Sequence, residues 1–210
     1  HRLALLDAEA SQERLAELAA SLGSACFVAG DLADENTWRQ AVPRIERELG
    51  AAPTLAALVA GGWRGGRSLH EETSDDTWRA MLSSNLETVH RGLRALLPAM
   101  VSAKRGSIVV VGSRAAQQPW SSAGSSAYAA AKSAVVALAQ TVAAEVRESG
   151  VRVNAILPST LDTPANRAAM PNADAGRWVS LASASGVIAF LLSDDARDIT
   201  GAAVPVYGRA

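Results

Sequence analysis

The chain has 210 residues, 49% of them hydrophobic, and its 20 basic and 21 acidic side chains give a formal net charge of −1. This length and composition fit one domain with a sizeable core, spanning residues 1–210. Because the charge is near zero and the basic residues are scattered, neither a nucleic acid nor an acidic membrane surface is expected as a partner. No apolar run approaches the roughly 18 residues of a membrane-spanning helix and no signal-peptide pattern opens the chain, so a cytoplasmic protein is expected.

The single cysteine, Cys26, has no partner for an internal disulfide and no set of His or Cys ligands around it. It is predicted to be a buried strand residue in a reducing compartment. The two internal histidines also lack metal-ligand spacing, so no metal site is predicted.

Apolar strand-like runs and helical patterns alternate along the whole chain. Strands are predicted over 2–6, 25–29, 55–60, 107–111, 151–157 and 203–206. Helices are predicted over 8–22, 35–49, 76–103 and 127–149, with a late helix that includes 186–192. Continuous apolar strands that alternate with helices predict a doubly wound α/β domain, in which helices cover both faces of a parallel sheet. Pro98 lies inside the 76–103 pattern and is expected to kink that helix or end it early.

Tyr128 and Lys132 lie one helical turn apart at the start of the 127–149 helix, and therefore on one face. An ammonium beside a phenol favours the phenolate, which lowers the tyrosine pKa from its ordinary value of roughly 10. A tyrosine tuned in this way can exchange a proton with an alcohol or carbonyl oxygen near neutral pH. Taken alone, the pair also fits a solvated helix face.

Two polar residues occupy suitable positions upstream of this pair. Ser113 follows the 107–111 strand, at the end of a parallel sheet where ligands bind. Asn85 falls on the apolar stripe of the 76–103 helix, where a buried amide needs partners. It either bonds local backbone or organises a site.

In chain order, Asn85, Ser113, Tyr128 and Lys132 resemble the catalytic tetrad of the short-chain dehydrogenase/reductase family. The resemblance extends over nearly the whole chain, through Gly30-Asp31-Leu32, Ala60-Gly61-Gly62, the run 152–158, Thr163 and Thr200-Gly201. It implies a Rossmann-type fold, hydride transfer with a nicotinamide cofactor, and a homodimer or homotetramer formed through the 76–103 and 127–149 helices.

The resemblance also implies a role for each residue of the tetrad. Tyr128 would be the acid/base, and Lys132 would lower its pKa and hold the nicotinamide ribose. Ser113 would polarise the substrate oxygen, and Asn85 would anchor a water. Ser113 precedes Tyr128 by two residues more than is usual in the family. Either the 117–126 loop bulges, or a nearby serine contributes instead, from among Ser121, Ser122, Ser125 and Ser126.

Asp7 ends the first predicted strand, where an acidic side chain can accept hydrogen bonds from the adenosine ribose hydroxyls. It would repel a 2′-phosphate, so NAD(H) is favoured over NADP(H). The alternative is that Asp7 only caps the next helix. The resemblance implies further cofactor contacts by Asp31, Leu32, Ala60, Gly61, Gly62, Pro158 and Thr163, although Asp31 also fits a simple turn.

One family feature has no counterpart in the sequence. The family's first strand and glycine-rich turn cradle the dinucleotide pyrophosphate, whereas residues 1–7 match its second strand. The expectation is a fold without that first strand and glycine-rich loop, about 30 residues of a βαβ unit. Either those residues lie upstream of His1, or the protein is truncated.

The segments 60–66, 157–167 and 170–174 are similar to dihydropteridine reductase, a branch that reduces quinonoid dihydropterins with NADH. The expected substrate is therefore a small carbonyl, an alcohol or a pterin-like molecule. Trp63 could stack on a pterin, but packing is the expected role of such a tryptophan. A non-catalytic or truncated scaffold that acts through oligomerisation is the alternative function.

Overall fold

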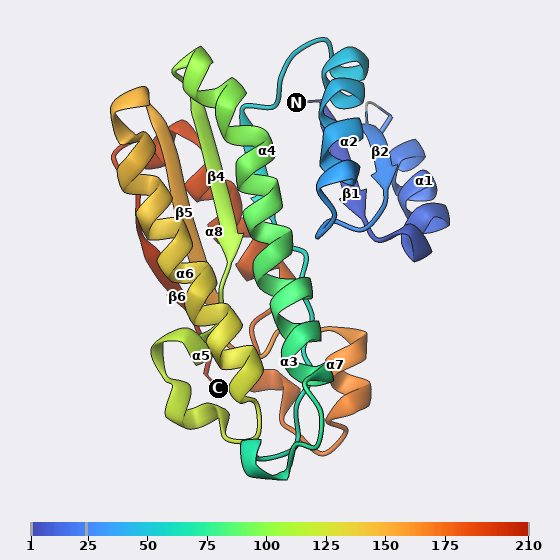
Figure 1. The fold of residues 1–210 in the computed structure, drawn as a ribbon, viewed down its shortest axis with the longest axis vertical. Helices are drawn as coiled ribbons and strands as arrows, with labels where there is room; N and C mark the ends of the chain where they lie inside the picture. The colour runs from blue at the N-terminus through green and yellow to red at the C-terminus, as the bar shows by residue number, and fades with distance from the viewer. Residues whose placement is uncertain (1, 24, 210) are drawn as a thin grey trace.

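The computed structural model describes residues 2–23 and 25–209, which form six parallel strands in two sheets. The strands are β1 (Leu3–Asp7), β2 (Ala25–Ala29), β3 (Leu55–Leu58), β4 (Gly106–Val111), β5 (Val151–Pro158) and β6 (Ala203–Val206). β1 pairs with β2, and the other four form a sheet in the order β3-β4-β5-β6. Figure 1 shows the strands of both sheets pointing the same way, so their carboxyl ends lie at the same end of the molecule.

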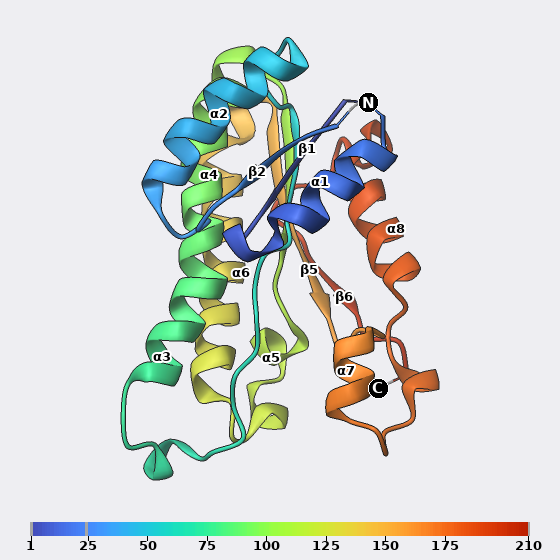
Figure 2. The ribbon, with the colours of Figure 1, turned by 90° about the vertical axis from the view of Figure 1, so that its right-hand side faces the viewer.

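Helices cover both faces of the strands. Five longer helices are α1 (Gln12–Ser21), α2 (Glu35–Leu49), α4 (Thr88–Ala103), α6 (Ser126–Val146) and α8 (Leu181–Leu192). Figure 2 shows α2, α4 and α6 on one face and α1 and α8 on the other. The doubly wound α/β architecture predicted from the sequence is confirmed.

Shorter helices lie beyond the carboxyl ends of the strands: α3 (Asp76–Met81), α5 (Arg114–Gln117) and α7 (Pro164–Ala169) (Figure 2). Single helical turns complete the description: η1 (Glu9–Ser11), η2 (Leu69–Glu71), η4 (Pro119–Ser122), η5 (Arg147–Ser149), η6 (Ala175–Arg177) and η7 (Asp194–Ala196). The sequence patterns indicated neither α5 nor α7, because these helices have only four and six residues, whereas α3 falls within the predicted 76–103 helix.

The core lies on both sides of β4. Ile108 and Val110 face the cluster that includes Val135 of α6, whereas Val109 faces the cluster that includes Leu191 of α8. A strand buried on both faces needs apolar side chains at every position, which explains the uninterrupted run in the sequence.

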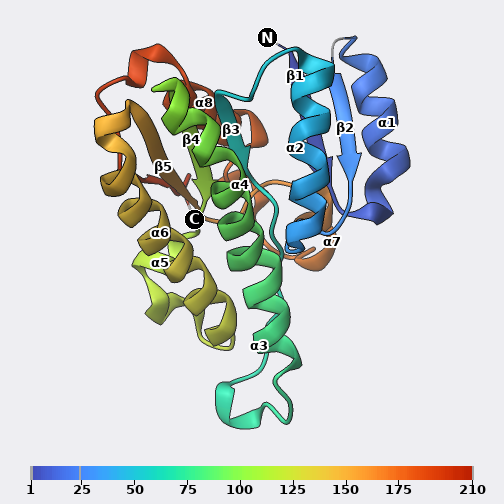
Figure 3. The same ribbon diagram turned by 45° about the horizontal axis from the view of Figure 1, so that its top comes forward.

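The two sheets share no strand pairing in the part of the chain that the structure describes. Instead, helix α2 connects them, since Trp38 of α2 packs with Val89 and Leu93 of α4. Figure 3 shows α2 beside α4. Among the described residues, β1 pairs only with β2.

The predicted 76–103 helix is continuous but not uniform. A π-helical turn, η3 (Leu82–Glu87), separates α3 from α4. Of the two effects expected of Pro98, a kink or an early end of the helix, the early end is wrong, because α4 continues to Ala103. Pro98 lies on the exposed side of α4, where water can bond the carbonyl that the missing N–H leaves free.

The expectation that no run is long and apolar enough to span a membrane is also wrong. Residues Ser126–Ser149 pass that test by length and composition, with a mean hydropathy of 1.3. The test is weak evidence here, because the core helix of a globular domain passes it too. α6 contributes Val135, Ala139 and Ala143 to the cluster between the helices and the sheet.

Gly92 sets how closely α4 approaches its neighbours. A Cβ at this position would lie 3.0 Å from a Leu58 methyl group and 3.2 Å from the Trp38 ring. We expect Gly92→Val to lower the free energy of unfolding by about 2 kcal/mol through overpacking.

The control is Gly186→Ala in α8, where no atom lies within 4 Å of the added methyl group. It should stabilise by up to about 1 kcal/mol through helix propensity. Urea denaturation measures both, and equal effects would contradict the packing described.

Candidate active site

Lys132 is a buried cation next to the sheet. Its side chain extends from the second turn of α6, and the residue is only 5% exposed. Nζ donates a hydrogen bond to the Val111 carbonyl at 2.8 Å and lies 5.9 Å from the centre of the Tyr128 ring. Burial lowers the pKa of Lys132 to about 8. The structure therefore brings Lys132 and Tyr128 together at the carboxyl end of β4.

The direction of the Tyr128 pKa differs from the sequence prediction. Burial raises this pKa, and a side-chain hydrogen bond with Ser113 only partly offsets the rise. The prediction that Lys132 lowers it is wrong for this structure. The ammonium donates its hydrogen bond to the Val111 carbonyl, and burial of the phenol is the largest influence on its pKa.

Ser113 is the serine that the structure places against Tyr128. It follows β4 and is buried, and its Oγ accepts a hydrogen bond from the Ala115 N–H at 3.2 Å at the start of α5. The short helices α5 and η4 take up the longer spacing between Ser113 and Tyr128. Ser121, one of the alternatives, is exposed and donates to the Gln118 carbonyl.

Asn85 joins the π-helical turn to the loop that follows β3. Its Oδ1 accepts from the Gly62 N–H at 3.2 Å, and its Nδ2 donates to the carbonyls of Gly62 and Met81, both at 3.0 Å. The side chain is fully buried. Asn85 thus bonds local backbone and also fixes the glycine loop beside Lys132. π-Helical turns are frequent at functional sites.

Gly61 leaves no room for a side chain. A Cβ there would lie 2.7 Å from Asn85 Oδ1 and 3.3 Å from Lys132 Nζ. Both contacts are closer than ordinary van der Waals distance, so a glycine is needed for the loop, the amide and the ammonium to meet.

Met81 is a site residue that the sequence indicated only as core. Its sulfur accepts the Arg64 N–H at 3.2 Å and lies 3.8 Å from Asn85 Nδ2, so it supports both the loop and the amide. The Val111 carbonyl, which accepts the hydrogen bond from Lys132, could not be predicted from the sequence, because every residue has a backbone carbonyl.

Asp7 lies at the carboxyl end of β1. Its Oδ1 accepts the Ala8 N–H at 2.8 Å, and its Oδ2 forms an ion pair with Arg14. Neither η1 nor α1 has a side-chain cap, so the alternative in which Asp7 caps the next helix is wrong.

The other predicted cofactor residues are placed as follows. Asp31 follows β2 and forms a turn, with Oδ1 accepting the Ala33 N–H at 2.9 Å, while the Leu32 side chain packs in the core. Ala60 precedes the glycine pair, and Pro158 ends β5. Thr163 Oγ1 caps α7 by accepting the Asn166 N–H at 3.1 Å.

A hollow of about 470 Å³ lies beside the start of α6, between the segments 64–78 and 124–127. Arg64, Arg67, Glu72 and Trp78 are among the residues that line it. The prediction that Trp63 packs is wrong, since 63% of its surface is exposed. Among the described residues, no group of His, Cys, Asp or Glu side chains could hold a metal ion.

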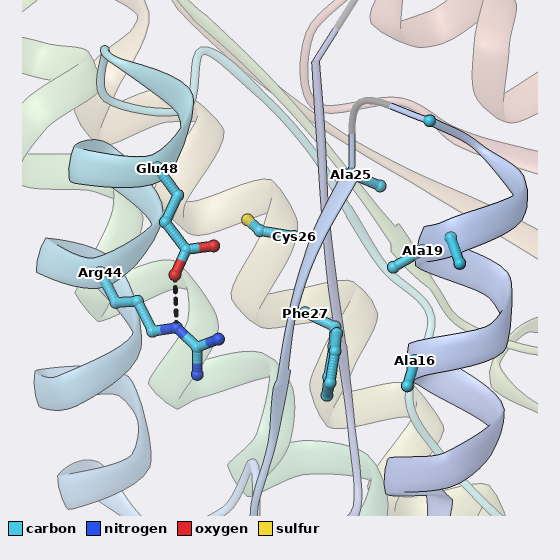
Figure 4. Close-up of a pocket in the computed structure, with 9 residues that line it drawn as sticks. Ala16, Ala19, Ala25, Cys26, Phe27, Arg44 and Glu48 are labelled. Atoms are coloured by element: carbon cyan, nitrogen blue, oxygen red, sulfur yellow. Dashed lines mark hydrogen bonds and ion pairs between the residues drawn. The ribbon is translucent and has the colours of Figure 1, made fainter.

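A second hollow, of about 350 Å³, is formed by α1, β2 and α2, none of which carries the tetrad (Figure 4). Small side chains such as Ala16 and Ala19 line it, and its Glu48 carboxylate is paired with Arg44. Cys26, whose pKa is raised by burial and by Glu48, borders the same space.

Comparison with known proteins identifies this arrangement. A family model described as enoyl-(acyl carrier protein) reductase matches residues 1–208. The 2,5-dichloro-2,5-cyclohexadiene-1,4-diol dehydrogenase LinX of Sphingobium indicum is 29% identical over 214 aligned positions, covering 97% of this chain and 82% of the relative. The 3-oxoacyl-[acyl-carrier-protein] reductase FabG of Pseudomonas aeruginosa is 30% identical over 186 positions, covering 85% and 73%.

Solved structures agree. The crystal structure of a 3-oxoacyl-[acyl-carrier protein] reductase with bound NAD from Brucella melitensis superimposes with a TM-score of 0.82 at 29% identity, covering 98% of this chain and 80% of that one. With the family match over nearly its whole length, the chain belongs to the short-chain dehydrogenase/reductase family of oxidoreductases.

Proposed function

We propose that this protein transfers hydride between a nicotinamide cofactor and a small carbonyl, alcohol or pterin-like substrate, with Tyr128 as the proton-transferring residue. One observation carries the proposal. The Tyr128 phenol lies against the Ser113 side chain and beside the buried Lys132 ammonium, at the carboxyl end of a parallel sheet. Ligands of doubly wound folds bind at that end.

The donors in the site suit a dinucleotide. The Lys132 ammonium has three protons to donate and makes one hydrogen bond within the described residues, to Val111. Its position next to Gly61, which has no side chain, leaves its other protons suited to ribose hydroxyls. Asp7 would accept from the adenosine ribose, which favours NAD(H), and Asp31 and Thr163 would contact the adenine and the carboxamide. When bound, the nicotinamide ring supplies or accepts the hydride.

The raised pKa of Tyr128 fits the acid role in reduction. At neutral pH the phenol keeps its proton, so it can donate to a substrate oxygen as negative charge develops there. Ser113 then donates to the phenolate that remains. The four residues of the tetrad therefore bind, orient and protonate, and their arrangement favours reduction at neutral pH.

The finer proposals concern the substrate and the assembly. The loop resemblances favour a dihydropteridine reductase-like activity on quinonoid dihydropterin, and exposed Trp63 beside the glycine pair offers a flat surface for such a ring. A homodimer or homotetramer through α4 and α6 and a cytoplasmic location remain predictions. A non-catalytic scaffold is the competing function.

Tyr128→Phe tests the proposed chemistry. We expect kcat/KM to fall by about 10³-fold, since the acid is removed, while saturable NADH binding followed by nicotinamide fluorescence is kept. Quinonoid dihydropterin and a panel of ketones serve as substrates. The control is Tyr207→Phe, which changes the other tyrosine, a donor to Gln117. Unchanged turnover in Tyr128→Phe would refute the role of Tyr128, and absence of saturable NADH binding in the wild type would favour the scaffold.

Gly61→Ala tests the close approach of the loop. The added methyl group must displace the Asn85 amide or Lys132, so we expect a loss of activity of about 100-fold with little change in unfolding free energy. Gly62→Ala is the matched control, because its methyl group would meet only Ser84 Oγ, at 3.9 Å. Equal activity of the two variants would contradict the geometry.

Lys132→Met tests the cost of burying the cation. Burial lowers the lysine pKa from 10.5 to about 8, which means that holding the charged form in the folded protein costs about 3 kcal/mol. Removing the ammonium removes this cost, but the hydrogen bond to Val111 is lost as well, which costs about 1 kcal/mol. We therefore expect Lys132→Met to raise the free energy of unfolding at pH 7 by about 2 kcal/mol while abolishing activity.

The lowered pKa of Lys132 also predicts that the free energy of unfolding depends on pH. Between pH 8 and 10.5 the unfolded wild-type chain holds a proton that folded Lys132 has released, so stability rises with pH in that window. Urea unfolding from pH 7 to 10 should show this slope in the wild type and not in Lys132→Met. The same slope in both proteins would show that Lys132 is not its source.

A further inference from the structure

The loop between β3 and α3 carries two arginines on a backbone that is fixed at several points. The Arg64 N–H donates to the Met81 sulfur at 3.2 Å, and the Gly66 N–H donates to the Gly124 carbonyl at 2.8 Å. Arg67 follows directly in the chain. Figure 1 shows this loop beyond the carboxyl ends of the strands, near α3 and the start of α6.

Both arginine side chains line the hollow of about 470 Å³ beside the start of α6. Arg64 and Arg67 are exposed, and neither guanidinium has an ion pair or hydrogen bond among the described residues. Two acidic side chains, Glu72 and Asp75, line the same hollow, but Asp75 is paired with Arg79 at 3.2 Å. Within the part of the chain that the structure describes, two guanidinium groups without an ion pair therefore share the hollow with one such carboxylate, so its net charge is positive.

The hollow also offers a flat apolar surface close to the proposed acid. Trp78 lines it and is 46% exposed, so the indole ring is available to cover an apolar part of a ligand. Ala127 lines it from α6, immediately before Tyr128, and packs in the same cluster as Tyr128 and Met81. The hollow therefore adjoins the residue that we assign to proton transfer.

We propose that this hollow is a substrate subsite for a carboxylate or phosphate group on a flat, apolar skeleton, with Arg64 and Arg67 as its specificity-determining residues. A guanidinium group presents a planar set of donors that matches the oxygens of either anion, and such charge-assisted hydrogen bonds are stronger than neutral ones. Glu72 opposes the anion by charge repulsion. The inference rests on the proposed function, because it makes the substrate an anionic carbonyl compound or the corresponding alcohol.

Binding of unreactive probes tests the subsite without turnover. Isothermal titration calorimetry compares benzoate and phenyl phosphate with neutral benzamide. We expect both anions to bind more tightly than benzamide, and Arg64→Gln and Arg67→Gln each to weaken anion binding by about ten-fold. Glu72→Gln should instead strengthen it by about two-fold, because repulsion between exposed charges is weak. A general loss of structure would not produce this gain.

The matched control is Arg197→Gln, which removes the same charge from an arginine paired with Asp198 outside the hollow and should leave anion affinity unchanged. The tighter of the two anions identifies the group that the subsite prefers, and either order supports the proposal. Equal affinities for benzoate and benzamide, or an unchanged anion affinity in either Arg64→Gln or Arg67→Gln, would overturn it.

Turnover connects the subsite with the reaction. 4-Carboxybenzaldehyde and its methyl ester carry the same aldehyde, which NADH reduces by adding hydride to the carbonyl carbon while Tyr128 gives a proton to the oxygen. We expect the ratio of kcat/KM for the acid to that for the ester to fall by about ten-fold in Arg64→Gln. An unchanged ratio overturns the inference alone. Failure of both aldehydes to react, with normal NADH binding, overturns the substrate role of the hollow, whereas absence of saturable NADH binding overturns the proposed function itself.

Discussion

The buried ammonium of Lys132 is the constraint around which the site is arranged. A cation removed from water needs acceptors, and the described residues provide one, the Val111 carbonyl, to which Lys132 Nζ donates. The remaining protons lie beside Gly61 and near Tyr128. Burying the ammonium with one acceptor costs stability, and a ligand with hydroxyl groups would supply the acceptors that its other protons need. The lowered pKa of Lys132 and its proposed hold on a ribose are therefore two consequences of the same burial.

The surrounding scaffold fixes the geometry of that cation. Asn85 bonds both backbone groups of Gly62, and the Met81 sulfur receives the Arg64 N–H, so the loop after β3 is held against the helix. The π-helical turn directs the Asn85 amide into this position while α4 continues to pack on the sheet. On the other side, the Ser113 side chain lies against Tyr128. Because burial raises the pKa of Tyr128, its phenol stays protonated at neutral pH.

The sequence was most informative where a feature depends on local pattern. Strands such as β4 and β5 were predictable because both of their faces are buried, and β2, α2 and β6 match their predicted bounds. The four residues of the proposed tetrad were predicted from residue type and order, and the structure brings Asn85, Lys132 and Tyr128 close together. Tertiary properties were not: the raised pKa of Tyr128 depends on the balance of burial and neighbours, and the Asp7–Arg14 pair depends on how α1 turns back on β1. The predictions of an early helix end at Pro98 and of a packed Trp63 were wrong for a related reason, because the sequence does not show that both residues are exposed.

The most direct test of this account is a titration of Lys132 itself. The chain contains two lysines, Lys104 and Lys132, so protein labelled with ¹³C at lysine Cε gives two side-chain signals by NMR, which Lys104→Arg assigns. We predict that Lys132 titrates near pH 8 in the protein without ligand. Titration at or above the ordinary lysine value of 10.5 would show that the ammonium is well solvated or fully paired, which contradicts the central claim.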